Sequence, residues 1–276
     1  MSVLRCGRYE LSIDRPGVMG IVNVTPDSFY DGGRYGDAAR AIAHARKLAE
    51  EGADILDIGG ESSRPGAEPV PAEEELRRVL PVLDALAGST VPISVDTVKP
   101  EVMRAAIEHG ATMINDITAL AQPGAMATVA ASGAAVCLMH MQGEPRTMQA
   151  NPTYEDVVAE VRDYLATRAA ACLQGGIARE RIVLDPGFGF GKTVTHNLQL
   201  LAHLDVIAAL GYPVLAGLSR KSSLGHISGR SAEERLASSL AAALLAAQRG
   251  ARILRVHDVA ATRDALAVLA AVEQNG

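Results

Sequence analysis

Eight short apolar runs, most of them preceded by a glycine, constrain the fold of this 276-residue chain more than any other feature. Six runs follow an alanine-rich amphipathic stretch that ends in a glycine, at Gly52, Gly110, Gly133, Gly176, Gly211 and Gly250. A glycine at that place can adopt the left-handed conformation that closes a helix, so each junction predicts a helix followed by a strand. The eight predicted strands are residues 18–24, 54–58, 91–96, 112–117, 134–140, 181–185, 213–218 and 251–257.

The arrangement of these strands follows from their composition. They are apolar on both faces and rich in β-branched residues, which is typical of parallel strands covered by helices. The segments between them have helical spacing, as in the apolar stripe of Tyr154, Val157, Val158, Val161, Leu165, Ala169, Cys172 and Leu173. With no Ser/Gly-rich linker, the sequence predicts one α/β domain over residues 1–276, a single (β/α)8 TIM barrel. Residues 3–13 predict a short N-terminal β-hairpin around Gly7 at the bottom of the barrel.

Charge and cysteine content exclude several classes of protein. The net charge of -6 predicts no general attraction to nucleic acid or anionic lipid. Three cysteines without CxxC spacing argue against a disulfide framework and a zinc site. The first ten residues lack the apolar stretch of a signal peptide, and glycine and proline interrupt the longest uncharged stretch, residues 117–143. We therefore expect a cytoplasmic protein that binds neither nucleic acid nor a membrane.

Polar side chains end almost every predicted strand. They are Asn23, Asp57, Asp96, Asn115, His140, Asp185, Ser219 with Arg220 and Lys221, and Arg255 with His257. Apolar strands have little reason to end in amides, carboxylates and cations unless a polar ligand binds there. Because the active sites of such barrels lie at the carboxyl ends of the strands, these side chains should converge on one site.

The converging residues divide into two chemical sets. One set offers acceptors, an amide and a cation to the edge of a nitrogen-rich heterocycle, and consists of Asp96, Asn115, Asp185 and Lys221. The other offers cations to phosphoryl oxygens and an amide oxygen to Mg²⁺, and consists of Asn23, Lys221, Arg255 and His257. The sequence therefore predicts a site for a heterocycle that carries a phosphate ester or a diphosphate.

Two predicted loops at the same end, residues 25–33 and 59–66, are rich in turn-forming residues. Each places one large side chain, Phe29 or Arg64, between small residues. This pattern predicts lids that close over a substrate and exclude water.

Together these segments resemble the bacterial dihydropteroate synthases, which are pterin-binding enzymes with a TIM-barrel fold. The resemblance covers essentially the whole chain and is carried by residues 20–29, 31–33, 57–66, 96, 115–117, 185–190, 219–222 and 255–258. It implies a transferase of folate biosynthesis that condenses 6-hydroxymethyl-7,8-dihydropterin diphosphate with p-aminobenzoate, giving 7,8-dihydropteroate and diphosphate. It also implies a homodimer, the usual assembly in this family.

The resemblance implies a role for each matching residue. The residues that would contact the pterin are Asp96, Asn115, Ile117, Met139, Asp185, Phe190, Gly217 and Lys221. Those that would contact the diphosphate are Asn23, Ser63, Arg255 and His257, and Asn23 would also bind Mg²⁺, the implied cofactor. The pocket for p-aminobenzoate, which sulfonamides mimic in this family, would consist of Phe29, Arg64, Pro65, Phe190 and Ser222. The implied catalytic residues are Lys221, Arg255, His257 and Asp31.

Two alternative functions differ in what they require of the site. A pterin-dependent methyltransferase of the same superfamily would not need diphosphate contacts, so Arg255, His257 and residues 219–222 disfavour it. A non-catalytic pterin-binding relative would have lost part of the catalytic machinery, and no expected group is missing.

The implied reaction also fits the residue types at the strand ends. Cleavage of the bond between the pterin methylene carbon and oxygen leaves a delocalised cation, so the chemistry calls for stabilisation of the leaving group rather than a nucleophile and base pair.

Overall fold

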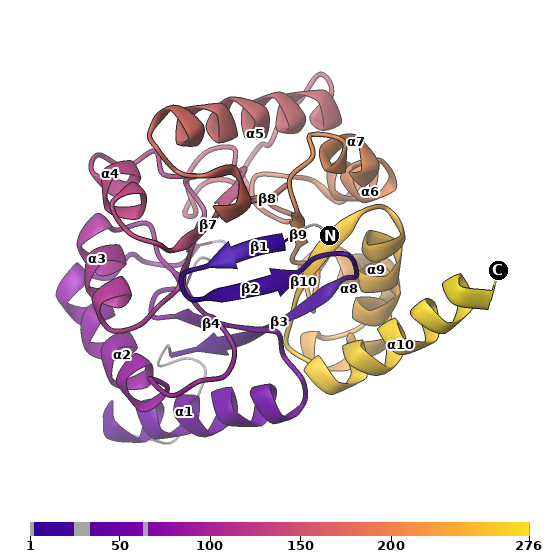
Figure 1. The fold of residues 1–276 in the computed structure, drawn as a ribbon. Helices are drawn as coiled ribbons and strands as arrows, with labels where there is room; N and C mark the ends of the chain where they lie inside the picture. Colours follow the sequence, from indigo (N-terminus) through magenta and orange to yellow (C-terminus); the bar gives the residue numbers. More distant parts are fainter. Residues whose placement is uncertain (1–2, 25–33, 63–65, 276) are drawn as a thin grey trace.

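A computed structural model describes residues 3–24, 34–62 and 66–275. In this part of the chain, parallel strands close into a barrel in the order β10-β3-β4-β5-β6-β7-β8-β9, with helices around the outside (Figure 1). The strands are β3 (Gly17–Asn23), β4 (Ile55–Gly59), β5 (Ile93–Asp96), β6 (Met113–Asp116), β7 (Ala135–Met139), β8 (Ile182–Asp185), β9 (Val214–Ala216) and β10 (Ala251–Val256). The predicted TIM barrel is confirmed, and each strand boundary lies within two residues of its predicted place.

The helices that cover the barrel follow these strands along the chain. They are α1 (Arg34–Glu50), α2 (Ala72–Ala85), α3 (Pro100–Glu108), α4 (Ala125–Ala130), α5 (Val157–Gln174), α6 (Val194–Ala202), α7 (Leu204–Ala208), α8 (Ser222–Ser228), α9 (Leu236–Gln248) and α10 (Val259–Asn275), with short 3₁₀ turns η2 (Arg179–Arg181) and η3 (Ala232–Glu234). Among the described residues, none of these helices is both long and apolar enough to cross a membrane.

Two details of the predicted helix ends are wrong. Gly133 does not adopt a positive φ, although the other five junction glycines do. At this junction the Ser132 hydroxyl accepts a hydrogen bond from the Ala134 amide at 3.1 Å, so a side chain supplies the turn. Leu173 is 42% exposed instead of buried, because its position in the last turn of α5 lies off the stripe of Val161, Leu165 and Cys172.

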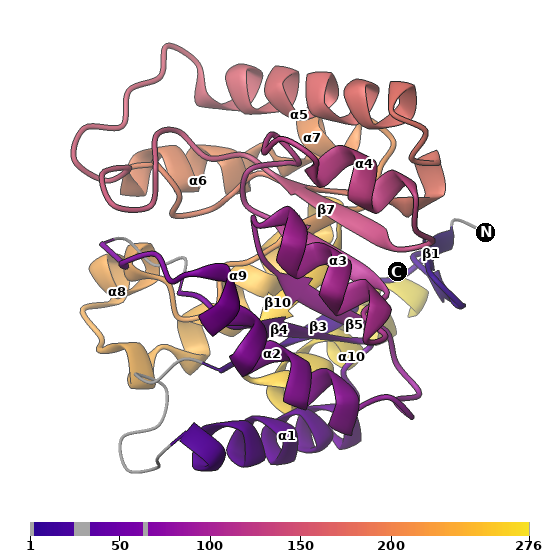
Figure 2. The ribbon, with the colours of Figure 1, turned by 90° about the vertical axis from the view of Figure 1, so that its left-hand side faces the viewer.

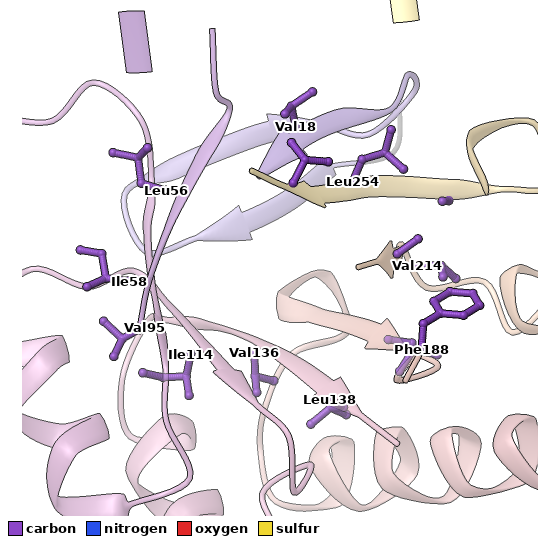
Figure 3. Close-up of a cluster of buried hydrophobic side chains, with 14 of the residues drawn as sticks. Val18, Leu56, Ile58, Val95, Ile114, Val136, Leu138, Phe188, Val214 and Leu254 are labelled. Carbon is purple, nitrogen blue, oxygen red and sulfur yellow. The ribbon is translucent and has the colours of Figure 1, made fainter. Parts of the chain in front are cut away.

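The barrel has two apolar layers, because successive side chains of a strand point to opposite faces. The outer layer packs the strands against the helices and includes Val18, Leu56, Val136 and Leu254 (Figure 3). The inner layer fills the lower part of the barrel and consists of Met19, Ile55, Met113, Ala135, Cys137, Val183, Leu215 and Ile253, together with Leu4 and Cys6.

The N-terminal hairpin supplies the last two members of the inner layer. Its strands β1 (Val3–Cys6) and β2 (Tyr9–Ser12) pair antiparallel across a turn at Gly7, as predicted. The hairpin lies across one end of the barrel in Figure 1, and Figure 2 shows it at the opposite end from α8. The amino-terminal end of the barrel is therefore closed, and the polar strand ends face the other side.

Candidate functional site

Asp57 of β4 joins four strand ends into one hydrogen-bond network. Its Oδ2 atom accepts from Arg255 Nε at 2.6 Å and from Asn115 Nδ2 at 3.1 Å. Arg255 Nη2 also donates to Asp96 Oδ2 at 3.1 Å. The closed barrel thus brings residues up to 198 positions apart into contact, as the strand-end pattern predicted.

Several buried polar atoms of this network have no hydrogen-bond partner among the described residues. They are Oδ1 of Asp57, Oδ1 of Asn115 and Oγ of Ser94. Buried polar atoms in native structures are normally paired, so unpaired acceptors on neighbouring strands indicate a place for a ligand. Two of these atoms are acceptors only, which suits a ligand with N–H donors along one edge.

Lys221 approaches the same space from the other side of the barrel. Its ammonium donates to the carbonyl oxygen of Phe188 and lies 4.6 Å from the centre of the Phe190 ring. Burial lowers the pKa of Lys221 to about 8, although the nearby Asp185 carboxylate acts in the opposite direction. An anionic group that enters the site would favour the charged form of this buried lysine and would be attracted to it.

Burial also disfavours the charged forms of the carboxylates. It raises the pKa of Asp96, and the positive charge of Arg255 opposes this shift. It raises the pKa of Asp185, where Lys221 and a 2.7 Å hydrogen bond from the Gly187 amide favour the carboxylate. In both carboxyl groups, burial therefore opposes the charged form, while neighbouring cations favour it.

The segment that carries Lys221 is anchored to the strand beside it. Ser219 Oγ lies 3.0 Å from His257 Nδ1, and it accepts a hydrogen bond from the His257 amide at 3.2 Å. Arg220 adopts a positive φ of 57° and binds Asp258 through Nε and Nη2 at 3.0 and 2.5 Å. These contacts hold the ends of β9 and β10 together and place Lys221 and His257 at the same edge.

The remaining predicted residues within the described ranges lie at the same carboxyl-terminal opening of the barrel, which we call the mouth. Asn23 ends β3 beside Gly59, and a Cβ atom built on Gly59 would lie 3.7 Å from Asn23 Oδ1 and 3.8 Å from Asp96 Cβ. Met139 pairs in register with Asp185, and a Cβ on Gly217 would lie 3.9 Å from Arg255 Cβ. Ile117 is buried near Asn115, and Ser222 begins α8 as an exposed residue.

Five predicted site residues lie outside the described residues. They are Phe29, Asp31, Ser63, Arg64 and Pro65. The described stem of the second loop is held firmly: Arg78 Nη1 donates to the Gly60 carbonyl at 2.8 Å, and Lys99 forms ion pairs with both Glu61 and Glu75.

Two features in and behind this site have no role that sequence reasoning predicts. Asp57 was noted as a strand end, but its central position depends on side-chain directions that spacing does not show. Lys192 is 3% exposed and lies 2.9 Å from His140 Nδ1, and only its place beside a glycine-rich loop could have drawn attention to it.

Comparison with known proteins agrees with this geometry. The chain matches the family described as pterin binding enzyme over residues 19–257. It is 53% identical to a dihydropteroate synthase of Neisseria meningitidis serogroup B, over 99% of this chain and 98% of that protein, and 52% identical to that of Escherichia coli K12, over 95% and 93%.

Solved structures are equally similar. Xanthomonas albilineans dihydropteroate synthase with 4-aminobenzoic acid has a TM-score of 0.94 and 59% identity, covering 99% of this chain and 98% of that one. Burkholderia cenocepacia dihydropteroate synthase complexed with 7,8-dihydropteroate has a TM-score of 0.91 and 52% identity, covering 99% and 97%.

Proposed function

The chain belongs to the pterin-binding enzymes, among the dihydropteroate synthases, and from this membership we propose the reaction that its site performs. It condenses 6-hydroxymethyl-7,8-dihydropterin diphosphate with p-aminobenzoate to 7,8-dihydropteroate and diphosphate, a step of folate biosynthesis. The observation that carries the proposal is the convergence of buried, unpaired acceptors with two cations at one mouth of the barrel. The relatives whose structures hold 4-aminobenzoic acid and 7,8-dihydropteroate support it.

The pterin would bind edge-on to the carboxyl and amide groups. Its N–H donors suit Asp96, Asp185 and the unpaired Oδ1 atom of Asn115. The flat faces of its ring system suit apolar walls, which would come from Ile117, Met139, Phe190 and Gly217. Desolvated polar partners of this kind reject ligands that lack matching groups, so they provide selectivity.

The cations would stabilise the leaving group. The methylene to oxygen bond breaks with its electron pair on the diphosphate, and the pterin delocalises the positive charge that remains on the methylene carbon. Arg255, Lys221 and His257 would lie on the side where the negative charge develops. The neutral amine of p-aminobenzoate then forms the new carbon–nitrogen bond and loses a proton. Asp31 would lie over the developing cation, and exclusion of water by the loops would prevent hydrolysis.

We propose Mg²⁺ as the cofactor, held by Asn23 together with diphosphate oxygens and water. The amide oxygen of Asn23 is a hard ligand of the kind that Mg²⁺ accepts, and it faces the same mouth as Asp96. When bound, the ion would neutralise charge on the diphosphate. A chelator should therefore weaken binding of the pterin diphosphate and leave binding of a pterin without diphosphate unchanged, as measured by calorimetry. Equal weakening of both ligands would contradict the assignment of Asn23.

The second substrate would bind above the pterin. The p-aminobenzoate pocket would consist of Phe190 and Ser222, together with Phe29, Arg64 and Pro65 of the two loops, and Ser63 would contact the diphosphate. Phe190 and Ser222 border the anchored segment that carries Lys221, which supports their place beside the reacting carbon.

We also propose a homodimer of single-domain subunits in the cytoplasm. Apolar side chains that are 40–66% exposed on α9 and α10 support association through these helices: Leu236, Leu245, Val268 and Val272. All three cysteines are buried and free, which suits a reducing compartment. Sedimentation equilibrium should give twice the mass of the chain, and substitution of Val268 and Val272 by aspartate should give the single mass.

The decisive experiment incubates the purified chain with the pterin diphosphate, p-aminobenzoate and Mg²⁺. We expect stoichiometric dihydropteroate and diphosphate. Binding of the pterin without product would instead indicate a non-catalytic relative. Methyl transfer from methyltetrahydrofolate to a corrinoid, with no synthase activity, would indicate the methyltransferase.

A further inference from the structure

A buried lysine supports the loop that carries Phe188 and Phe190. Lys192 Nζ donates to His140 Nδ1 at 2.9 Å, to the Phe190 carbonyl at 3.0 Å and to the His140 carbonyl at 3.4 Å. An ammonium has three N–H donors, so these three acceptors satisfy it completely. None of the three carries a charge, and burial lowers the pKa of Lys192 to about 7.

His140 is arranged to accept this hydrogen bond. Burial and the charge of Lys192 lower its pKa to about 3, so the ring is neutral at physiological pH and Nδ1 can act as an acceptor. Tyr164 packs edge-on against the ring with 4.9 Å between centres. The His140 amide donates to the Asp185 carbonyl at 3.0 Å, so the histidine is fixed to the end of β8 as well.

The loop between β8 and α6 is packed against this pair without free space. A Cβ on Gly187 would lie 1.9 Å from the His140 carbonyl oxygen, and one on Gly191 would lie 2.3 Å from that of Gln142. Tyr154 also donates to the Gly191 carbonyl at 2.8 Å. The loop therefore has little room to shift relative to His140 and Gln142.

The other side of this loop faces Lys221. The Phe188 carbonyl accepts from Lys221, the Phe190 ring lies beneath its ammonium, and a Cβ on Gly189 would lie 3.2 Å from its Cδ. The two lysines thus hold neighbouring carbonyls of one loop from opposite sides. Lys221 lies at the site, and Lys192 is buried on the other side of the loop.

We propose that Lys192, braced by His140, is a positioning residue that sets the place of Phe190 and Lys221 for the pterin diphosphate. The inference rests on the proposed function. A buried ammonium whose hydrogen-bond acceptors are all neutral is costly to desolvate, even though the nearby Asp185 carboxylate favours its charge. An apolar side chain of similar length would fill the same volume. What the amine provides, and an apolar side chain cannot, is a fixed Phe190 carbonyl.

The test compares Lys192→Met with Leu200→Ala, a variant of the hydrophobic core. We expect Lys192→Met to lower kcat/KM for the pterin diphosphate by about 10- to 100-fold, the usual effect of a misplaced reacting group, and to keep its melting temperature. Leu200→Ala in α6, which is fully buried and follows the same loop, should lose melting temperature and keep kcat/KM. Lys192→Met with unchanged kcat/KM would overturn the proposal.

A second pair of variants decides the question if Lys192→Met does not fold. His140→Asn keeps an acceptor near the place of Nδ1 and should retain most of kcat/KM, whereas His140→Leu removes it and should lose about 10-fold or more. Equal values for the two would overturn the proposal. If the unaltered chain makes no dihydropteroate, the proposed function fails by itself. Pterin affinities of the same variants, measured by calorimetry, then test the positioning role, and equal affinities would overturn it.

Discussion

At the scale of the residue, Lys221 combines an observed contact with a proposed role. It donates a hydrogen bond to the loop carbonyl of Phe188, and in the proposed reaction it would bring a positive charge to the developing diphosphate. Lys221→Ala should therefore lower kcat/KM by about 100- to 1,000-fold, the range found when one stabilising donor is removed. The exposed Lys47→Ala serves as control in steady-state assays with both substrates. A Lys221→Ala enzyme within a few-fold of the control would show that this lysine does not act on the leaving group.

The burial of Lys192 predicts that the stability of the fold depends on pH. Its pKa of about 7 in the folded chain lies below the 10.5 of an exposed lysine, so from pH 7 to 10.5 the unfolded chain binds more protons. The free energy of unfolding must then rise with pH across this window. Relative to Lys192→Met, the unaltered chain should gain about 2 kcal/mol between pH 7 and pH 9, measured by urea unfolding. A constant difference over that window would mean that the lysine is not desolvated.

At the scale of the element, the loop after β8 depends on glycine for two separate reasons. Gly187 has a φ of 69°, and its missing side chain leaves room for the His140 carbonyl. Gly176 has a φ of 89°, and a Cβ atom built on it would meet no other atom within 4 Å. A substitution there therefore measures only the cost of the positive φ. Gly176→Ala should cost about 1–2 kcal/mol. Gly187→Ala should cost clearly more, about 4 kcal/mol, and should also reduce activity, because the loop must move.

Urea unfolding and synthase assays of the two alanine variants check this expectation. Equal destabilisation by both would show that the loop can relax away from β7. The comparison also separates strain from function, since Gly176 lies at a junction remote from the site.

The order of the elements could be predicted from the sequence because each junction carries its own local signal. A glycine with positive φ ends the segment before five of the strands. The hydrophobic periodicity and the composition of each segment can be recognised without knowing its distant contacts. The exceptions, Gly133 and Leu173, are places where one side chain decides the outcome: the Ser132 hydroxyl replaces the glycine turn, and the last turn of α5 faces solvent.

The site could be predicted only in part, for a physical reason. Closure of the barrel requires that strand ends meet, so the convergence of Asp96, Asn115 and Arg255 follows from residue type and position. The choice of partners does not follow, because it depends on side-chain rotamers in three dimensions. Asp57 as the shared acceptor and Lys192 behind the loop are two such cases.

At the scale of the whole molecule, stability and chemistry are divided between the two ends of the barrel. Leu4 is 1% exposed and inserts into the inner layer from the hairpin. Leu4→Ala should lower the free energy of unfolding by about 2–5 kcal/mol through the cavity it leaves. Because the site lies at the other end, the KM values of both substrates should stay unchanged in the folded fraction. A shift in either KM would show that the inner layer transmits strain to the mouth.

Because the hairpin and the inner layer fill the amino-terminal end of the barrel, both substrates and both products of the proposed reaction would have to pass through the opposite end. With the pterin below p-aminobenzoate, as proposed, the pterin diphosphate would have to bind first. The product dihydropteroate would occupy the binding positions of both substrates, so it would have to dissociate through the same opening before the next turnover.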